Sequence, residues 1–386
     1  MKEDESTDKQ LGSYRICNSC LMDTSDPAIR FNSGGVCSYC DTYESKKRAF
    51  VPTPDIGKKL LREMVDYCLA AGKGKQYDCV IGVSGGVDST YVAWLVKDLG
   101  LRPLAVHLDN GWNSELAISN IRNVLQKLGV ELHTHVLDWE EFRDLQLAFL
   151  RASTPDSEIP SDHAIVALMR QIADKEGVPV IWGVNFSSEA ILPQAWSQGH
   201  MDWTYIRNVN KAFGNPPLKS FPHYSVWRLI YYNRIRRQKL FNVLNYIDYN
   251  KEDAKRFLEK EAGWRDYGGK HYESVYTRIF QSYILPVKFG YDKRKAHYSS
   301  LILAGQISRE DAIELLKKPL FDTNTIEDDI QYLIKKFQIT REEFEKIMTF
   351  PHRSYHDYRS KWPDWVKRIE KSIFGVLISL KKKIRS

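Results

Sequence analysis

The chain has 386 residues, of which 43% are hydrophobic, and this suffices for two or three domains with ordinary buried cores. Its formal net charge of +7, from 56 basic and 49 acidic residues, suits a phosphorylated substrate or a modest nucleic-acid patch and selects neither. No apolar run reaches the roughly eighteen residues that a membrane span needs, and the acidic residues 1–5 do not resemble a signal peptide, so we expect a cytoplasmic protein.

Cysteine usage gives the first motif. All six cysteines lie within the first 79 residues, and four form two C-x-x-C pairs with sixteen residues between the pairs: Cys17, Cys20, Cys37 and Cys40. This spacing is typical of a zinc ribbon, in which four thiolates hold one structural zinc ion. The alternative is a pair of disulfides, which needs an oxidising compartment. Cys68, on a helical pattern, and Cys79, inside a strand pattern, are expected to be buried thiols.

The following segments alternate between helix and strand patterns. Residues 51–55 contain two prolines and predict a linker, and residues 56–69 predict an amphipathic helix. Strands are predicted at 79–83, 102–108, 132–137 and 179–182, and helices near 89–99, 116–128 and 162–176. This alternation predicts an α/β fold with a doubly wound parallel sheet, whose ligands bind at the carboxyl ends of the strands.

The first predicted strand ends in a glycine-rich loop that leads into a helix. The loop reads Ser84-Gly85-Gly86-Val87-Asp88-Ser89, and bare backbone N–H groups beside a helix N-terminus form a cradle for an anion. A Walker loop would continue with a lysine, which is absent here. The loop resembles the PP-loop of the ATP pyrophosphatases, which cleave ATP between the α- and β-phosphates and transfer AMP to a substrate oxygen. This resemblance implies a set of ATP-binding residues around the pyrophosphate: Ser84, Gly85, Gly86, Asp88 and Ser89.

Candidate ligand-binding residues, most of them polar, also follow the second and fourth predicted strands. They are His107, Asp109 and Asn110 after one strand, and Gly183, Asn185 and Glu189 after the other. In the superfamily that the loop resembles, the first position borders the adenine and the reacting oxygen, and the second flanks the ribose and the α-phosphate. The alternative is structural: Asp109 and Asn110 would form a turn, and Glu189 would cap a helix.

Residues 196–249 break the pattern, because aromatic and basic side chains interleave there. A nucleic-acid face, a helical insertion and a pocket for a phosphorylated sugar are all compatible with this composition, and core packing is the expected role of most of the aromatics. Farther along, Ser308 and Thr340 are predicted to open short helices. The amphipathic segment 365–380 is predicted to dock on the core, with contact to an anionic membrane surface as the alternative.

Charged and aromatic residues are dense in 263–278 and in 285–297, where the chain reads Asp292-Lys293-Arg294-Lys295-Ala296-His297. Together with the loop and the ribbon, these segments resemble the N-acetyl sugar amidotransferases of bacterial surface-polysaccharide synthesis, from residue 17 to about residue 316. The resemblance implies four parts: a zinc ribbon over 1–50, a PP-loop α/β domain over 51–195, an insertion and substrate-binding region over 196–320, and a helical region over 321–386.

The same resemblance implies a reaction. An enzyme of this family adenylates the acetamido oxygen of a nucleotide-linked N-acetyl sugar, and ammonia then displaces AMP to give an acetamidino sugar for lipopolysaccharide O-antigen or a related glycan. Asp88 and Asp109 are expected to act as catalytic carboxylates that help to hold Mg²⁺, and Lys288 and Lys293 to clamp the departing pyrophosphate. The expected substrate-binding residues are Asn110, Asn185, Glu189, Glu273 and Arg278.

The ammonia needs a source outside this chain. A glutaminase requires a catalytic cysteine, but residue 2 is lysine and no cysteine follows Cys79. We therefore expect a separate glutaminase subunit (HisH-like), with a cyclase-like (HisF-like) companion, and no nucleic-acid partner. One alternative is a tRNA-modifying PP-loop enzyme that adenylates a base before sulfur transfer, which commonly uses cysteines near the active site. A second is a non-catalytic protein that senses nucleotides.

Overall fold

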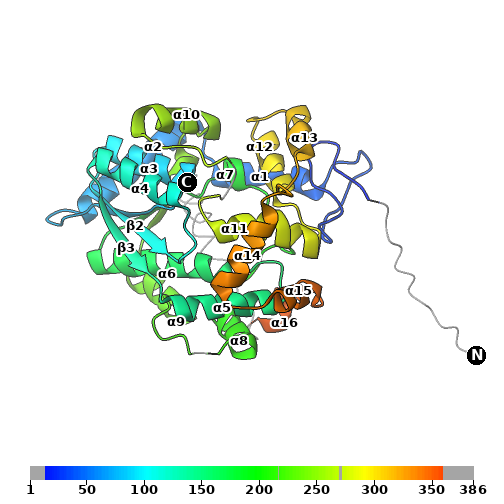
Figure 1. The fold of residues 1–386 in the computed structure, drawn as a ribbon. Coiled ribbons are helices and arrows are strands. Elements are labelled where there is room, and N and C mark those ends of the chain that lie inside the picture. Colours follow the sequence, from blue (N-terminus) through cyan, green and yellow to red (C-terminus); the bar gives the residue numbers. More distant parts are fainter. Residues whose placement is uncertain (1–13, 216, 269–271, 360–386) are drawn as a thin grey trace, which may run out of the picture.

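The computed structural model describes residues 14–215, 217–268 and 272–359, and it is built around one parallel β-sheet (Figure 1). Five strands pair in the order β3-β2-β1-β4-β5, with the bounds β1 Cys79–Gly82, β2 Pro103–Asp109, β3 Glu131–Val136, β4 Val180–Trp182 and β5 Leu240–Asn242. Each of these pairings is parallel. The strand order reverses between β1 and β4, and such a reversal opens a crevice for ligands at the carboxyl edge of an α/β sheet.

Helices cover both faces of the sheet, which confirms the doubly wound prediction (Figure 1). One face carries α3 Val87–Asp98 and α4 Glu115–Leu128, with α2 Pro54–Ala71 and α10 Lys251–Ala262 in the same core; the other carries α6 Ile159–Glu176, with α5 Trp139–Arg151 beside it. Within β1, Ile81 packs into the core that contains Val92 of α3, whereas Val80 packs into the core that contains Met169 of α6. Burial on both faces explains why these strands read as apolar runs.

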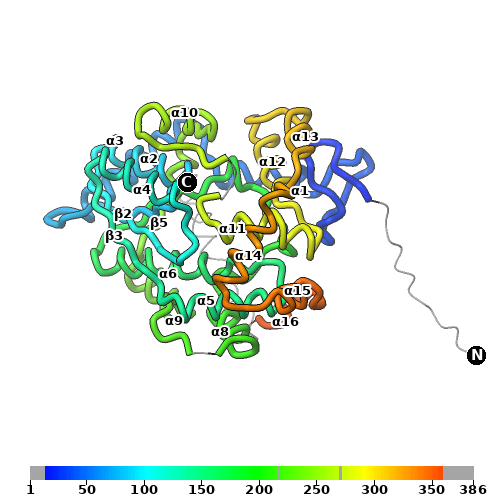
Figure 2. Tube along the Cα trace, viewed as in Figure 1, coloured from blue at the N-terminus to red at the C-terminus, as the bar shows by residue number. Residues whose placement is uncertain are grey.

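The C-terminal part of the described chain is helical, as predicted. Its elements are α11 Val275–Ile279, the π-helix η3 Phe280–Phe289, α12 Lys293–Leu303, α13 Arg309–Lys317, α14 Ile326–Phe337, α15 Arg341–Thr349 and α16 Tyr355–Tyr358. Leu333 and Phe337 of α14 and Ile347 of α15 belong to the core that also holds α5 and α6. Figure 2 traces α14 between α11 and α5, so this region is packed onto the α/β unit.

The segment 196–249 differs from the predicted break in the pattern. It forms α8 Trp203–Phe213, α9 Val226–Ile230, the π-helix η1 Tyr231–Ile235, the strand β5 and the short helix η2 Val243–Tyr246. Trp196, Tyr205 and Tyr232 are at most 1% exposed, which confirms core packing for them, whereas Trp227 is 67% exposed. β5 escaped the sequence analysis because three residues carry no periodic signal. Similarly, α2 begins at Pro54, inside the predicted linker.

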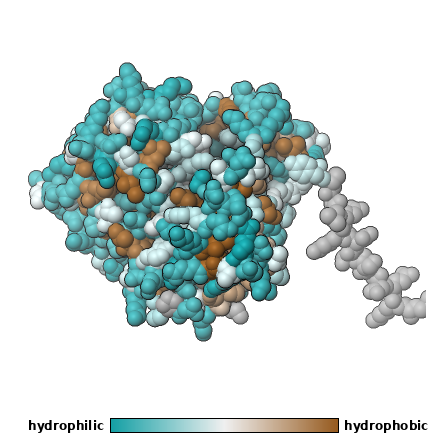
Figure 3. Space-filling view, viewed as in Figure 1, coloured by the Kyte–Doolittle hydropathy of each residue, from teal (hydrophilic) through white to brown (hydrophobic). Residues whose placement is uncertain are grey.

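Other predictions can be placed on the structure. The Ser308 and Thr340 side chains accept the backbone N–H groups of Asp311 and Glu343, so both residues cap helices as predicted. Segment 365–380 lies outside the described residues, and the four domain boundaries remain predictions. Among the described helices, none combines the length and apolarity that a membrane crossing requires. On the face drawn in Figure 3, apolar residues form small separate groups among polar ones.

Candidate active site

The loop between β1 and α3 is held in shape by its own hydrogen bonds. Ser89 Oγ accepts the Ser84 backbone N–H at 3.2 Å and donates to the Gly86 carbonyl at 3.1 Å. Gly85 has a φ of +82°, and a Cβ there would lie 2.6 Å from the Ala117 carbonyl oxygen, so only glycine fits without a shift. Because α3 begins directly after the second glycine, its N-terminal N–H groups point into the loop.

Two residues far along the chain close around this loop. Gly183, just after β4, faces the first turn of α3, where a Cβ on Gly183 would lie 3.3 Å from the Ser89 backbone nitrogen. Trp264 Nε1 donates to the Gly85 carbonyl at 2.8 Å, and the Trp264 side chain is buried. The loop therefore lies at the reversal between β1 and β4, and its predicted partner Gly183 is brought to it.

Glu273, a predicted substrate-binding residue, also reaches the loop. Its Oε1 lies 3.7 Å, and the Tyr267 hydroxyl 3.2 Å, from the position that a Cβ would take on Gly86. The Glu273 carbonyl accepts the Ser114 backbone N–H at 2.8 Å, so its segment is paired with the loop that follows β2. Burial and the negative charge of Glu273 raise the pKa of Tyr267, which keeps its phenol neutral beside the loop.

Asp88, in the first turn of α3, has two partners from the chain after β5. The Tyr249 hydroxyl donates to one carboxylate oxygen, and Lys251 Nζ lies 3.5 Å from the other. Burial and the charge of Asp88 raise the pKa of Tyr249, so its phenol stays protonated. The sequence analysis missed Lys251 because it missed β5. One signal could have marked it: a lysine at the first position of a helix is unfavourable to the helix dipole, which points to another role.

Polar side chains after β2 form a connected chain at the same edge. The Val83 carbonyl accepts a hydrogen bond from His107 Nδ1 at 2.9 Å, which leaves Nε2 to accept from Asn113 Nδ2 at 3.1 Å. The same Asn113 nitrogen donates to Asp109 Oδ1 at 3.0 Å. His107 and Asp109 are thus fixed relative to β1, the strand that leads into the glycine-rich loop.

The turn expected as the alternative for Asp109 and Asn110 is present. Asp109 Oδ1 accepts the Gly111 backbone N–H at 2.9 Å, and Asn110 Oδ1 accepts the Trp112 backbone N–H at 3.2 Å. Asn110 Nδ2 also donates to Ser161 Oγ on α6 at 3.1 Å. These contacts are structural, and they hold both side chains rigidly at the carboxyl edge of the sheet.

Asn185 and Glu189 lie on the short helix α7 Phe186–Glu189 and its N-terminal flank. Asn185 Oδ1 accepts the Ser188 backbone N–H at 2.9 Å, so Asn185, rather than Glu189, caps this helix. Asn185 is 1% exposed, and its Nδ2 has no hydrogen-bond partner among the residues that the structure describes. The charge of Glu189 contributes to the raised pKa of Tyr249, which places Glu189 near the partners of Asp88.

Two of the predicted residues are engaged by the C-terminal helices. Arg278 donates to Asp329 of α14 at 2.8 Å. Lys288 Nζ donates to the Ile347 carbonyl of α15, and burial lowers the pKa of Lys288 to about 8. In Figure 1, α15 lies on the opposite side of the molecule from α3. The structure therefore does not bring Lys288 to the loop as a pyrophosphate clamp, and the contacts described for Arg278 do not include the loop.

Lys293 belongs to a buried charged cluster at the N-terminus of α6. Its Nζ lies 3.1 Å from Glu158 Oε2, while His200 Nε2 lies 3.6 Å from Asp156 and 3.3 Å from Asp162. Burial opposes the charge of His200, but these carboxylates raise its pKa to about 10. Because α6 leads into β4 and runs against it, this cluster lies at the carboxyl edge of the sheet. Lys293 is therefore near the site, with Glu158 as its direct partner.

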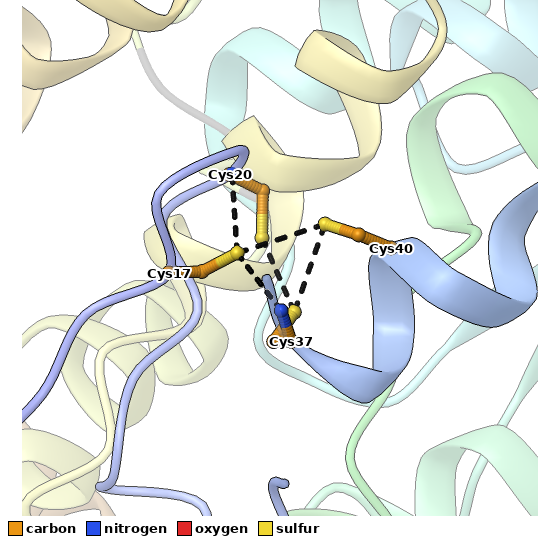
Figure 4. Close-up of side chains that lie close together, drawn as sticks. All are labelled: Cys17, Cys20, Cys37 and Cys40. Carbon is orange, nitrogen blue, oxygen red and sulfur yellow. Dashed lines mark hydrogen bonds between the residues drawn. The ribbon is translucent and has the colours of Figure 1, made fainter. Parts of the chain in front are cut away.

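The four cysteines of the predicted ribbon converge at the N-terminal end of α1 Ser38–Phe50, whose first turn contains Cys40 (Figure 4). Their Sγ atoms all lie within 4.8 Å of one another, with separations of 3.8 Å for Cys17 and Cys40, 3.6 Å for Cys20 and Cys37, and 3.7 Å for Cys37 and Cys40. A tetrahedral zinc ion with Zn–S bonds of about 2.3 Å places its sulfurs about 3.8 Å apart. All four thiols are free, so this donor set fits zinc and the disulfide alternative is wrong here.

An open pocket of about 440 Å³ lies in the C-terminal half. It is lined by Tyr272, the residue before Glu273, and by residues 318–323, which connect α13 to α14. Phe321 packs edge-on against Tyr283, and Arg278 lies over the Tyr272 ring. The pocket lining thus combines two aromatic side chains with one lysine, Lys318, and one aspartate, Asp322.

Two family models match parts of the chain. Residues 59–151, which contain the loop, β1 and β2, match NAD synthase. Residues 273–371 match the model described as "LPS biosynthesis protein WbpG-like, C-terminal domain". No sequence among the curated proteins matches the chain.

Solved structures show more distant likenesses. The NH3-dependent NAD synthetase from Campylobacter jejuni is 18% identical, with 40% of this chain and 72% of that chain covered and a TM-score of 0.28. The NMN synthetase from Francisella tularensis is 12% identical, with 78% and 98% covered and a TM-score of 0.32. The glutamine-dependent NAD+ synthetase from Acinetobacter baumannii is 16% identical, with 79% and 48% covered and a TM-score of 0.35. At TM-scores this low the likenesses carry no argument.

The loop geometry, the parallel sheet and the NAD synthase match over residues 59–151 support a protein of the PP-loop class, whose members use ATP. The WbpG-like match over residues 273–371 adds a link to lipopolysaccharide biosynthesis. Together the two matches support a PP-loop amidotransferase family involved in polysaccharide biosynthesis, in agreement with the family that the sequence resembles.

Proposed function

We propose that the protein converts the acetamido group of a nucleotide-linked N-acetyl sugar into an acetamidino group, with ATP and ammonia as co-substrates, for lipopolysaccharide O-antigen or a related glycan. The observation that carries the proposal is the preformed loop at the β1–β4 reversal, closed by Gly183 and Trp264, with the Asp88–Lys251 pair at its rim. The use of ATP by the PP-loop class supports a cytoplasmic location.

The chemistry follows from the weakness of an amide as an electrophile. The amide oxygen attacks the α-phosphorus of ATP, and the bond to the β-phosphate oxygen breaks, so that pyrophosphate leaves. Ammonia then adds to the amide carbon, loses protons to the surroundings, and expels AMP together with the original amide oxygen. The loop N–H groups and Lys251 would stabilise the negative charge that develops on the departing pyrophosphate.

The carboxylates at the edge of the site fit a role in holding Mg²⁺. Asp109 Oδ1 is occupied by the Asn113 and Gly111 donors, whereas Oδ2 accepts no hydrogen bond from the residues that the structure describes. Asp88 offers a second carboxylate within the first turn of α3. Oxygen ligands of this kind suit Mg²⁺, which would neutralise phosphate charge when bound.

We propose the pocket at Tyr272 and residues 318–323 as the place for the nucleotide part of the substrate. Its two aromatic side chains, Tyr272 and Phe321, suit a base, and Lys318 suits a phosphate. Glu273, the next residue, would then face the sugar at the loop.

A separate glutaminase is proposed as the source of ammonia. Four cysteines form the cluster, and Cys68 and Cys79 are 0% exposed, so no cysteine of the described chain is placed to hydrolyse glutamine. The same burial speaks against the tRNA-thiolation alternative, since neither thiol is open to carry sulfur.

The test uses a substrate whose acetamido oxygen is ¹⁸O. The purified chain is incubated with ATP, ammonium and a panel of nucleotide-linked acetamido sugars, and the products are analysed by mass spectrometry. The proposal expects a sugar lighter by about one mass unit relative to the unlabelled substrate, pyrophosphate, and AMP that carries the ¹⁸O label, because the amide oxygen departs on AMP. Formation of ADP and orthophosphate, or unlabelled AMP, would refute it.

A further inference from the structure

Helix α12 joins the cysteine cluster to the rest of the molecule. Ser299 Oγ on this helix accepts the Leu21 backbone N–H at 2.9 Å, and both residues are 0% exposed. Leu21 follows Cys20 directly. From α13, Arg309 donates to the carbonyls of Cys17 at 3.0 Å and Cys20 at 3.3 Å. The backbone of the first C-x-x-C pair is therefore hydrogen-bonded to residues almost three hundred positions later.

An adjacent face of α12, about 100° around the helix, contacts the candidate active site. Ser300 Oγ accepts the Ile191 backbone N–H at 3.1 Å, and His297 Nδ1 lies 3.2 Å from the Ser188 carbonyl. Ser188 belongs to α7, the short helix that Asn185 caps after β4. At the N-terminus of α12, Lys293 pairs with Glu158 at the carboxyl edge of the sheet.

The packing around these hydrogen bonds is continuous. Cys17, Cys20 and Cys37 share one hydrophobic cluster with Ile191 and Trp196, which follow α7, and with Ala296 of α12. Lys295 of α12 pairs with Asp23, whose side chain is fully buried. The cysteine cluster, α12 and the residues that follow α7 are thus packed directly against one another, so a displacement of the cysteines also displaces the residues next to α7.

Metal binding and local folding are coupled in sites of this kind. A bound metal ion would join the four thiols, which lie within 4.8 Å of one another, and without the ion this crosslink is lost. The short backbone turns that present the cysteines then lose their main constraint, and the hydrogen bonds to Ser299 and Arg309 lose their fixed partners.

We propose that α12 transmits the order of the metal-loaded cysteine cluster to the candidate active site, so that metal loss loosens α7 and the Asn185 flank although the ion lies outside the site. Ser299, which contacts the cysteine segment, and Ser300, which contacts the segment after α7, are the positioning residues of this connection. The inference goes beyond the reaction proposed above and does not depend on it.

Amide hydrogen exchange tests this connection without ATP or sugar, so its outcome is separate from that of the proposed reaction. In the wild-type chain, a chelator should speed exchange in residues 17–40, in 186–191 and in 293–303, while β1 and β2 keep their protection. Faster exchange confined to 17–40 would overturn the proposal. Equal loss of protection in β1 and β2 would also overturn it, because the loosening would then be global.

Two variants divide the connection. Ser299→Ala should retain the metal, measured by inductively coupled plasma mass spectrometry, yet speed exchange in 186–191 about fivefold, as expected for one lost buried hydrogen bond. Ser300→Ala removes the acceptor of the Ile191 backbone N–H, and it should also retain the metal and speed exchange in 186–191. Ser45→Ala is the matched control, since Ser45 is exposed on α1 and its hydroxyl only donates to the Thr42 carbonyl. If both variants leave exchange in 186–191 at the control level, the connection is refuted.

Discussion

Replacing Gly85 by alanine gives a direct test of the loop geometry. Two penalties are expected. The left-handed backbone, with φ at +82°, costs a non-glycine residue about 1–2 kcal/mol. The new Cβ would also lie 2.6 Å from the Ala117 carbonyl oxygen, and forcing an atom into packed structure costs about 1–3 kcal/mol. Gly85→Ala should therefore lower the free energy of unfolding by about 2–5 kcal/mol.

Gly100 supplies the matched control. Its φ is +77°, but a Cβ there would meet nothing within 4 Å, so Gly100→Ala should lose only the backbone part, about 1–2 kcal/mol. Urea denaturation followed by circular dichroism measures both variants, and the difference between them isolates the contact with Ala117. The chain should remain folded in both cases.

The functional consequence separates the two variants further. A loop displaced by about 1 Å misaligns the pyrophosphate, so Gly85→Ala should lower kcat/KM for ATP by about 100-fold in an AMP-release assay. Gly100→Ala should leave kcat/KM unchanged. If Gly85→Ala proves no less stable than Gly100→Ala and keeps its AMP release, the packed glycine turn does not set the loop geometry.

Three further predictions concern charge and metal. Lys251→Met should lower kcat/KM for AMP release by about 100-fold because the cation beside Asp88 is lost, whereas Lys255→Met on the same helix should retain activity; equal losses would contradict a role for Lys251. The pKa of His200, raised to about 10, gives stability that is complete below pH about 6.5 and is lost as the pH rises through 10, so the wild type should lose more urea stability over that window than His200→Gln. Parallel pH profiles would refute this assignment. Cys37→Ser should lower the bound zinc, measured by atomic absorption, well below about one ion per chain, and unaltered zinc would contradict the four-thiolate site.

The sequence predicted the α/β part of the fold well because each element there carries its own local signal. The apolar runs at β1 and β2 and the glycines of the loop require no knowledge of the rest of the chain. β5 was missed, since its three residues become a strand only by pairing with β4. Lys251 was missed with it, although it lies closer to Asp88 than any lysine that was predicted to act there.

The predicted site residues fall into two groups: those positioned by local strand topology and those positioned by the packing of distant helices. Gly183, His107 and Asp109 lie at strand ends, so parallel topology alone brings them to the loop. Lys288 and Arg278 lie in a dense charged segment, and their partners are on α15 and α14, helices whose packing no local pattern encodes. Tertiary contacts between distant segments determine whether such charged side chains reach the loop.

The bonds from the first C-x-x-C turn to α12 and α13 also have a consequence for synthesis. Leu21 and Ser299 are 278 positions apart, so at about 5–20 residues per second the ribosome takes roughly 15–60 s between making one and the other. During that interval the nascent cysteine turn has no partner to complete it. A circular permutant that begins at residue 51 and carries residues 14–50 after residue 359 would shorten the interval between the synthesis of Ser299 and that of Leu21. Its folding yield in vivo should exceed that of the chain in its natural order.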